Sequence, residues 1–154
     1  MRLWHYDLID VLPRRQLLSQ WREVKYIKTK TIELGKPNHN LVNIVIDYPV
    51  DDLKKYGQAV VIELIRRGYK VNLMNYYNLM EWNGDGKFIT DTHPELYKLA
   101  TNKDSKPFPN WHNDKYLRQC IANLKEKYDR GAIPDSEWNK IDEKFSKIIQ
   151  EMKI

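Results

Sequence analysis

Apolar side chains recur at helical spacing after Pro13. Positions three or four residues apart predict the buried stripe of a helix, formed by Leu17, Leu18, Trp21, Val24 and Lys28. Asp10 is a suitable N-cap and Pro13 fits a first helical turn, while Gly35 and Pro37 predict the end of the helix. The other side of this helix is polar and holds Arg15, Gln16, Ser19, Gln20, Arg22, Glu23 and Tyr26. A helix side of this composition is most often solvated surface.

The same spacing predicts three further helices. The first covers residues 49–67, with an apolar face formed by Tyr56, Val60, Val61, Leu64 and Ile65. The second covers residues 113–128, with an apolar face formed by Tyr116, Leu117, Cys120, Ile121 and Leu124. The third covers residues 135–152, with Asp135 as its N-cap. Each of these segments also carries start or stop signals that suit a helix.

Two stretches are less regular. Residues 38–47 indicate a short strand or a buried extended segment, and residues 69–111 show little pattern beyond turn signals. No internal repeat or linker divides the chain. We therefore expect a mainly α-helical, compact fold with one domain over residues 1–154, in which residues 135–154 form an additional C-terminal helix.

Charge is unevenly distributed along the chain. The net charge is +5, and residues 1–36 hold eight Lys/Arg against four Asp/Glu, whereas residues 37–102 are nearly balanced. A localised basic excess favours a polyanionic partner such as a nucleic acid, although an ordinary basic surface would give the same totals. No apolar run reaches the roughly 18 residues needed to span a bilayer, so no membrane partner is expected. The single cysteine, Cys120, makes no intramolecular disulfide, which fits a cytoplasmic protein.

Common catalytic motifs are missing from the sequence. The histidines lack the spacing of metal ligands, the glycines form neither a P-loop nor a dinucleotide fingerprint, and no serine has a GxSxG context. We therefore expect no metal and no organic cofactor. Any chemistry would have to come from the functional groups of the chain itself.

The amino terminus and Glu23 form one candidate catalytic pair. An α-amine has an unperturbed pKa of about 7.7–8.0, so much of it is neutral near pH 7, and the cationic Arg2 and Arg22 are expected to lower that pKa. A bulky residue after Met1 normally prevents its removal, so Met1 should carry the free amine. A neutral amine can attack a sugar carbon to form an imine, and a carboxylate can then move protons. The alternative is that Met1 is a loose end and that Glu23 pairs on the surface with Arg22 or Lys25.

Three stretches of the chain carry a family pattern. The first begins Met1-Arg2-Leu3 and continues to Trp21-Arg22-Glu23. The second, residues 43–70, ends in the basic-Gly-aromatic turn Arg67-Gly68-Tyr69, and the third is the helical stretch 114–127. Together they resemble the pyrimidine-dimer DNA glycosylases, the endonuclease V class first known from phage. The opening Met-Arg-Leu-Trp-His resembles a bacterial branch of that family.

The resemblance implies a DNA repair enzyme. Such an enzyme flips a base out of damaged duplex DNA, displaces the 5′ pyrimidine of a UV dimer with its terminal amine, forms an imine at C1′, and then cleaves the strand as an abasic-site lyase. In this chain the α-amine of Met1 would be the nucleophile, and Glu23 would stabilise the intermediate and move protons. Tyr26 stands where the family has an arginine, so Lys25 or Lys28 would supply that charge. The side chains expected to contact DNA are Arg2, Arg15, Gln16, Arg22, Lys25 and Tyr26.

The implied partner is double-stranded DNA with damaged bases, bound by a monomer that is cytoplasmic and nucleoid-associated while on DNA. Two other functions stay open. A non-catalytic nucleic-acid-binding module on the same fold would use the basic side chains without a covalent step. The same amine could also act on another base lesion or on a small aldehyde. Trp4, His5 and Tyr6 fit either a lesion pocket or a set of core anchors.

Overall fold

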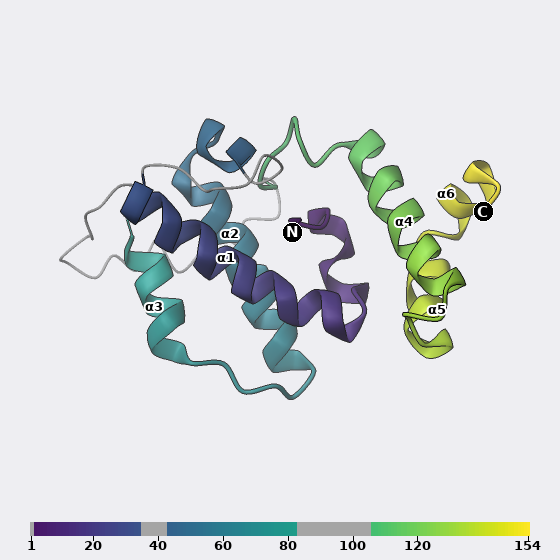
Figure 1. Ribbon diagram of the computed structural model, residues 1–154, viewed down its shortest axis with the longest axis horizontal. Helices are drawn as coiled ribbons and strands as arrows, with labels where there is room; N and C mark the ends of the chain where they lie inside the picture. The colour runs from purple at the N-terminus through teal and green to yellow at the C-terminus, as the bar shows by residue number, and fades with distance from the viewer. Residues whose placement is uncertain (1, 35–42, 83–105) are drawn as a thin grey trace.

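The computed structural model describes residues 2–34, 43–82 and 106–154 (Figure 1). Within these ranges every element is a helix: η1 (Tyr6–Val11), α1 (Arg14–Leu34), η2 (Asn43–Asp47), α2 (Val50–Arg66), α3 (Leu73–Glu81), α4 (Asp114–Asp129), α5 (Asp135–Lys144) and α6 (Ser146–Met152). The elements η1 and η2 are short 3-10 helices, and the others are α-helices. The expectation of a mainly α-helical fold is confirmed.

The helices form two groups with the start of the chain between them (Figure 1). In the first group, α1 packs along α2, and α3 contacts both. In the second group, α4, α5 and α6 contact one another. The 3-10 helix η1 touches α2 on one side and α5 on the other, so the segment before α1 joins the two groups.

Gly57 allows the three helices of the first group to approach closely. A Cβ atom at this position would lie 2.5 Å from Cδ2 of Leu79 on α3 and 3.1 Å from Cγ1 of Val24 on α1. Both distances are shorter than ordinary van der Waals contact. Glycine is poor in a helix interior by about 1 kcal/mol relative to alanine, so close packing offsets an unfavourable local preference here.

One hydrophobic core runs through both groups. Its buried members come from the start of the chain, from α1 to α5 and from α6, and include Leu3, Leu8, Val24, Val60, Ile121, Trp138 and Ile149. The apolar faces predicted for α2 and α4 are mostly buried, as helical spacing requires. Ile65 is an exception, since about half of its surface is exposed. It lies near the end of α2.

The prediction that Asp10 is the N-cap of α1 is wrong. Asp10 lies within η1, and α1 begins at Arg14, with the Pro13 carbonyl accepting the first helical hydrogen bond from Leu17 N at 2.9 Å. The Asp10 carboxylate instead binds Lys144 Nζ at 2.6 Å. Periodicity could not reveal this, because the competing partner lies more than a hundred residues away in the sequence.

The buried side of α1 also differs from the predicted stripe. Leu17, Trp21 and Val24 are buried, together with Ile27, which the prediction omitted. Leu18 and Lys28 are only half-buried. Gln20, assigned to the polar side, is 1 % exposed. A buried amide needs hydrogen-bond partners, and Gln20 finds them at the start of the chain.

Two local predictions in the middle of the chain also fail. Residues 43–47 form the 3-10 helix η2 and not a strand, while residues 38–42 lie outside the described residues. The helix α3 was not predicted, because its sequence is short and rich in Tyr and Asn. Asn72 starts it by accepting from the backbone N–H groups of Met74 and Asn75 at 2.9 and 3.3 Å.

The C-terminal segment forms two helices where one was predicted. The chain breaks at Phe145 between α5 and α6, and Pro134, not Asp135, precedes the first turn of α5. Asp135 instead accepts a hydrogen bond from Tyr128 Oη at 2.8 Å. The first of these helices packs on η1 and α4. Within the described ranges, no helix has the length and apolar character to cross a membrane.

Candidate functional site

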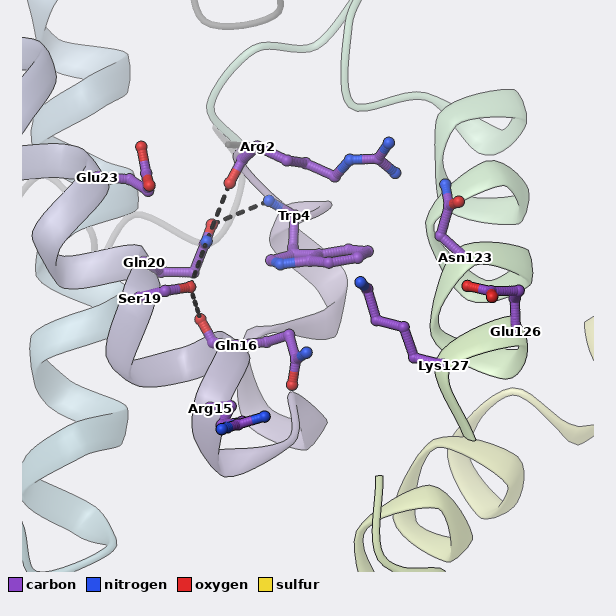
Figure 2. Close-up of a pocket in the computed structure, with 10 residues that line it drawn as sticks. All are labelled: Arg2, Trp4, Arg15, Gln16, Ser19, Gln20, Glu23, Asn123, Glu126 and Lys127. Carbon is purple, nitrogen blue, oxygen red and sulfur yellow. Dashed lines mark hydrogen bonds between the residues drawn. The ribbon is translucent and has the colours of Figure 1, made fainter. Parts of the chain in front are cut away.

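A cleft of about 520 Å³ lies between the first half of α1 and the face of α4 that is turned toward it (Figure 2). Residues from three parts of the chain line it: Arg2 and Trp4 from the start, Arg15, Gln16, Ser19, Gln20 and Glu23 from α1, and Asn123, Glu126 and Lys127 from α4. Three of these side chains are cationic and two are carboxylates. The cleft is therefore polar with a basic excess.

The start of the chain forms the back of the cleft. Gln20 Nε2 donates to the carbonyl of Arg2, and Gln20 Oε1 accepts from the backbone N–H of Trp4, both at 2.9 Å. The Arg2 guanidinium carbon lies 5.1 Å from the centroid of the Trp4 ring. In Figure 2 this side chain extends across the cleft toward α4. Met1 itself lies outside the described residues.

Glu23 lies on α1 three residues after Gln20, so both side chains are on the same face of the helix. Its Oε2 atom is buried and has no hydrogen-bond partner among the described residues. Desolvation raises the pKa of this carboxyl, although neighbouring positive charge, including that of Arg22, opposes the rise. A carboxylate with a raised pKa and a free acceptor atom is suited to take up and return a proton.

Gln16 and Arg15 complete the α1 wall one turn earlier. Gln16 Oε1 is buried and also lacks a hydrogen-bond partner within the described part of the chain. Ser19 Oγ, which lies between Gln16 and Glu23, donates to the Gln16 carbonyl at 2.8 Å. Two buried acceptor atoms without partners on one wall are unusual in a folded protein. Both are in position to receive hydrogen bonds from a bound molecule.

The α4 wall was not predicted from the sequence. Asn123 and Lys127 lie four residues apart on one face of α4, with Glu126 beside them. The Lys127 ammonium points toward the Trp4 ring (Figure 2). Helical spacing does place these polar residues together, but no local signal shows that this face of α4 is turned toward α1.

The residues matched by a comparison with known families cover the amino-terminal part of this site. A family model with the description pyrimidine dimer DNA glycosylase matches residues 1–76. These residues are similar to that family. The matched segment contains the start of the chain and α1, and with them Arg2, Arg15, Gln16 and Glu23. No curated protein and no solved structure matches the chain.

The other predicted contacts in the glycosylase-family segment lie on α1 but outside the lining of the cleft. Arg22 is exposed, and the Lys25 ammonium lies 5.5 Å from the centroid of the Trp21 ring. The Tyr26 ring lies 5.9 Å from Lys30 Nζ. These residues therefore extend the basic surface along α1 beyond the cleft.

The three aromatic residues at the start of the chain, Trp4, His5 and Tyr6, lie in different surroundings. Trp4 lines the cleft, whereas His5 is buried and stacks on His112 with ring centroids 5.2 Å apart. Tyr6 borders a separate cavity beside α5. His5 is thus a core residue, and Trp4 is the one of the three that faces the candidate site.

The two stacked histidines are neutral. Burial, followed by the charge of His5, lowers the pKa of His112 to about 3, and burial also lowers the pKa of His5. His112 Nδ1 accepts from the backbone N–H of Tyr6 at 2.9 Å, and His5 Nδ1 accepts from that of Asp7 at 3.0 Å. Among the described residues, no group of His, Cys, Asp and Glu has the arrangement of a metal site.

Proposed function

We propose that this protein is a DNA glycosylase with abasic-site lyase activity, acting on UV pyrimidine dimers in duplex DNA. The observation that carries the proposal is the position of Glu23. Its buried carboxylate oxygen, which has no hydrogen-bond partner among residues 2–34, 43–82 and 106–154, lies in a basic cleft whose back wall is the start of the chain. The family of residues 1–76 supports a damaged DNA strand as the molecule that occupies this cleft.

The nucleophile is the α-amine of Met1. Met1 is joined directly to Arg2, whose carbonyl is bound by Gln20 one turn from Glu23. Consecutive Cα atoms are about 3.8 Å apart, so the amine is within one residue of a backbone group fixed at the cleft. An α-amine with a pKa near 8 is partly neutral at physiological pH, and the adjacent Arg2 guanidinium disfavours its charged form.

The reaction begins with the damaged nucleotide rotated out of the base stack, because C1′ is not accessible within the duplex. The amine nitrogen forms a bond to C1′, and the bond from C1′ to the pyrimidine nitrogen breaks. The ring then opens to the imine, and the pyrimidine stays attached to its neighbour through the cyclobutane ring. Loss of a proton from C2′ and of the phosphate from C3′ cleaves the strand, and water releases the amine.

In these reaction steps Glu23 carries protons and provides the counter-charge for the cationic imine. Desolvation raises its pKa, which brings the carboxyl closer to the range in which both protonation states are populated. General acid–base catalysis of this kind contributes about 10²–10⁴-fold to a rate. Its buried oxygen has no hydrogen-bond partner within the described ranges to compete for the proton.

The basic side chains hold the DNA backbone. Arg2, Arg15 and Lys127 line the cleft and would contact phosphates beside the lesion, while Arg22 and Lys25 would contact the strand farther along α1. Contacts of this kind release counterions, so binding should weaken as salt rises. Gln16, whose buried oxygen has no partner in the described part of the chain, would accept a hydrogen bond from the nucleotide in the cleft.

Borohydride trapping on a duplex with one abasic site tests the proposal. Protein with an untagged amino terminus should yield a covalent adduct whose modified residue is Met1. Dimethylation of the amine should abolish the adduct, since a tertiary amine cannot form an imine. Glu23→Gln should lower strand cleavage by about 10³-fold while DNA binding survives. Binding without any adduct would reject catalysis and favour the non-catalytic binding module.

A second substrate set distinguishes the lesions. The same protein is offered duplexes with a cyclobutane dimer, with another damaged base, and with a plain abasic site, and also a small aldehyde. Cleavage at the dimer supports the proposal in full. Cleavage at the abasic site alone would restrict the activity to the lyase step, and an adduct with the aldehyde but not with DNA would reject the DNA substrate.

A further inference from the structure

The backbone of the first residues is paired along both of its edges by side chains. On one edge, the Gln20 amide donates to the Arg2 carbonyl and accepts from Trp4 N–H, each at 2.9 Å. On the other edge, Tyr116 Oη donates to the Leu3 carbonyl at 2.6 Å. Carbonyls of successive residues that point to opposite sides are typical of an extended chain.

The Gln20 amide takes the place of a neighbouring strand. In a parallel pair, one residue donates to the carbonyl before the facing residue and accepts from the N–H after it. The side-chain amide of Gln20 makes both of these bonds around Leu3. An α-helix thereby holds an extended segment with the register that a strand would impose.

Burial makes this pairing costly to break. Gln20 is 1 % exposed, and the hydroxyl of the fully buried Tyr56 lies 2.7 Å from both Gln20 Oε1 and the Trp4 carbonyl. Burial raises the pKa values of Tyr56 and Tyr116, so both phenols stay protonated and act as donors. A buried backbone group that loses its partner is left without a hydrogen bond and without water to replace it, so residues 2–4 do not shift freely.

We propose that Gln20 and Tyr116 are positioning residues that fix the amine of Met1 relative to Glu23. This inference rests on the proposed function, because it concerns the same amine. Gln20 and Glu23 share one face of α1, so the bond from Gln20 to Arg2 sets the distance between the start of the chain and the carboxylate. Tyr116 belongs to α4, beyond the family-matched residues. The second group of helices thus takes part in catalysis without touching the reacting atoms.

The physical reason is the entropy of a chain end. A terminal amine attached to a free segment samples many positions, whereas attack on C1′ needs one. Correct placement of reacting groups is worth orders of magnitude in rate, and a displacement of about 1 Å can cost about 10²-fold. The hydroxyl of Tyr116 and the amide of Gln20 hold residues 2–4 and so limit the positions open to the attached amine before DNA binds.

Three variants test the proposal. Tyr116→Phe removes the hydroxyl alone, and Gln20→Met keeps the side-chain length but removes both hydrogen bonds. Tyr128→Phe is the matched control, since it removes a hydroxyl on the same helix that binds Asp135 and not the start of the chain. The readouts are the single-turnover rate of adduct formation at saturating protein and the Kd for a duplex with an uncleavable abasic analogue.

We expect adduct formation to slow by about 10-fold in Tyr116→Phe and by about 100-fold in Gln20→Met. The Kd should change by less than about 2-fold, because the phosphate contacts are retained. Tyr128→Phe should match the parent in both. Wild-type rates in Tyr116→Phe and Gln20→Met would overturn the proposal. If Gln20→Met fails to fold, Tyr116→Phe alone decides.

A readout independent of catalysis separates this inference from the proposed function. Reductive methylation with ¹³C-formaldehyde labels the Met1 amine for NMR, and a pH titration of its signal gives the amine pKa and line width. In the parent the signal should be broad, because the segment that carries the amine is held, and in Tyr116→Phe it should sharpen. An absent adduct in the parent would reject the proposed function, and an unchanged amine signal in both variants would reject the positioning role.

Discussion

The contacts within the first group of helices differ in kind from the contacts that hold the start of the chain between the two groups. In the first group, α1, α2 and α3 approach so closely that a Cβ atom at Gly57 would lie 2.5 Å from the Leu79 side chain, and the contacts around Gly57 are apolar. The start of the chain is instead held by directed polar bonds from both sides. Gln20 of α1 and Tyr56 of α2 bind the backbone of Arg2 and Trp4. From the other side, bonds run from Tyr116, His112, Lys144 and Glu137 to the segment before α1 and to Arg14.

The apolar contacts mainly stabilise the fold, whereas the polar bonds determine how the residues of the site are arranged. Apolar packing is insensitive to pH and little affected by salt, whereas hydrogen bonds and ion pairs depend on protonation and ionic strength. The first group carries the family sequence and the carboxylate. The second group supplies the facing wall of the cleft and, through Tyr116, binds the Leu3 carbonyl. Changes in pH should therefore act mainly through the junction between the two groups.

The largest expected effect is a loss of stability in acid that runs through His112. Its folded pKa of about 3 lies below its ordinary value of 6.5, so between these values the unfolded chain binds a proton that the native protein does not. Stability therefore falls as the pH drops through this window, by about 1.4 kcal/mol per unit at most and about 5 kcal/mol over the whole window. Denaturant unfolding between pH 8 and pH 4 measures the slope.

His112→Asn is the comparison for that measurement. Asn offers an acceptor near the Nδ1 position for Tyr6 N–H, but it does not titrate. We expect a lower stability at pH 7, where the ring is missing, and a much shallower decline toward pH 4. A variant with the same slope as the parent would show that acid acts elsewhere in the molecule.

A larger side chain at Gly57 should disrupt the close apolar packing of α1, α2 and α3. Gly57→Val places methyl groups against Val24 and Leu79, and overpacking of this kind costs about 2 kcal/mol. Gly57→Ala should be nearly neutral, because the end of the Leu79 side chain can move and alanine gains about 1 kcal/mol of helix preference. The loss in the valine variant should be the same at pH 5 and pH 8. Equal stability of both variants and the parent would disprove the close approach.

The sequence predicted the fold better than it predicted the site. Helical spacing located α1, α2 and α4 because their apolar faces repeat at three and four residues. It placed Gln20 on a solvated side, because a buried amide paired with a distant backbone has no local signature. For the same reason it gave Asp10 the role of a cap, although the carboxylate binds Lys144.

For the site, the family resemblance identified residues on the α1 wall of the cleft and at the start of the chain, but none on the α4 wall. Arg2, Arg15, Gln16 and Glu23 all line the cleft. The α4 wall depends on the packing of two helices about a hundred residues apart in sequence, and no pattern within either helix specifies it. Tyr116 was read as part of an apolar stripe, yet its hydroxyl is the group that reaches Leu3.

The two walls of the cleft can be compared by their contribution to DNA binding. Lys127→Gln on α4 and Arg15→Gln on α1 should each weaken binding by about 5-fold at low salt and lower the salt slope by about one. Lys125→Gln is the control, since Lys125 forms an ion pair with Asp129 away from the cleft. Fluorescence anisotropy over a salt series gives both quantities. A loss in the Arg15 variant alone would mean that DNA contacts one wall and that α4 is not part of the interface.

The smallest effect is expected at the ion pair between α5 and η1. Lys144 Nζ lies 2.6 Å from Asp10 Oδ1 and also donates to the Asp7 carbonyl at 2.7 Å, but both side chains are substantially exposed. A double-mutant cycle with Lys144→Met and Asp10→Asn should give a coupling of about 0.5 kcal/mol that declines with salt. The bond to the Asp7 carbonyl lies outside this cycle, so Lys144→Met alone should cost more than the coupling. A coupling of several kcal/mol would place this pair, and not Tyr116 and His112, as the main attachment of the second group of helices.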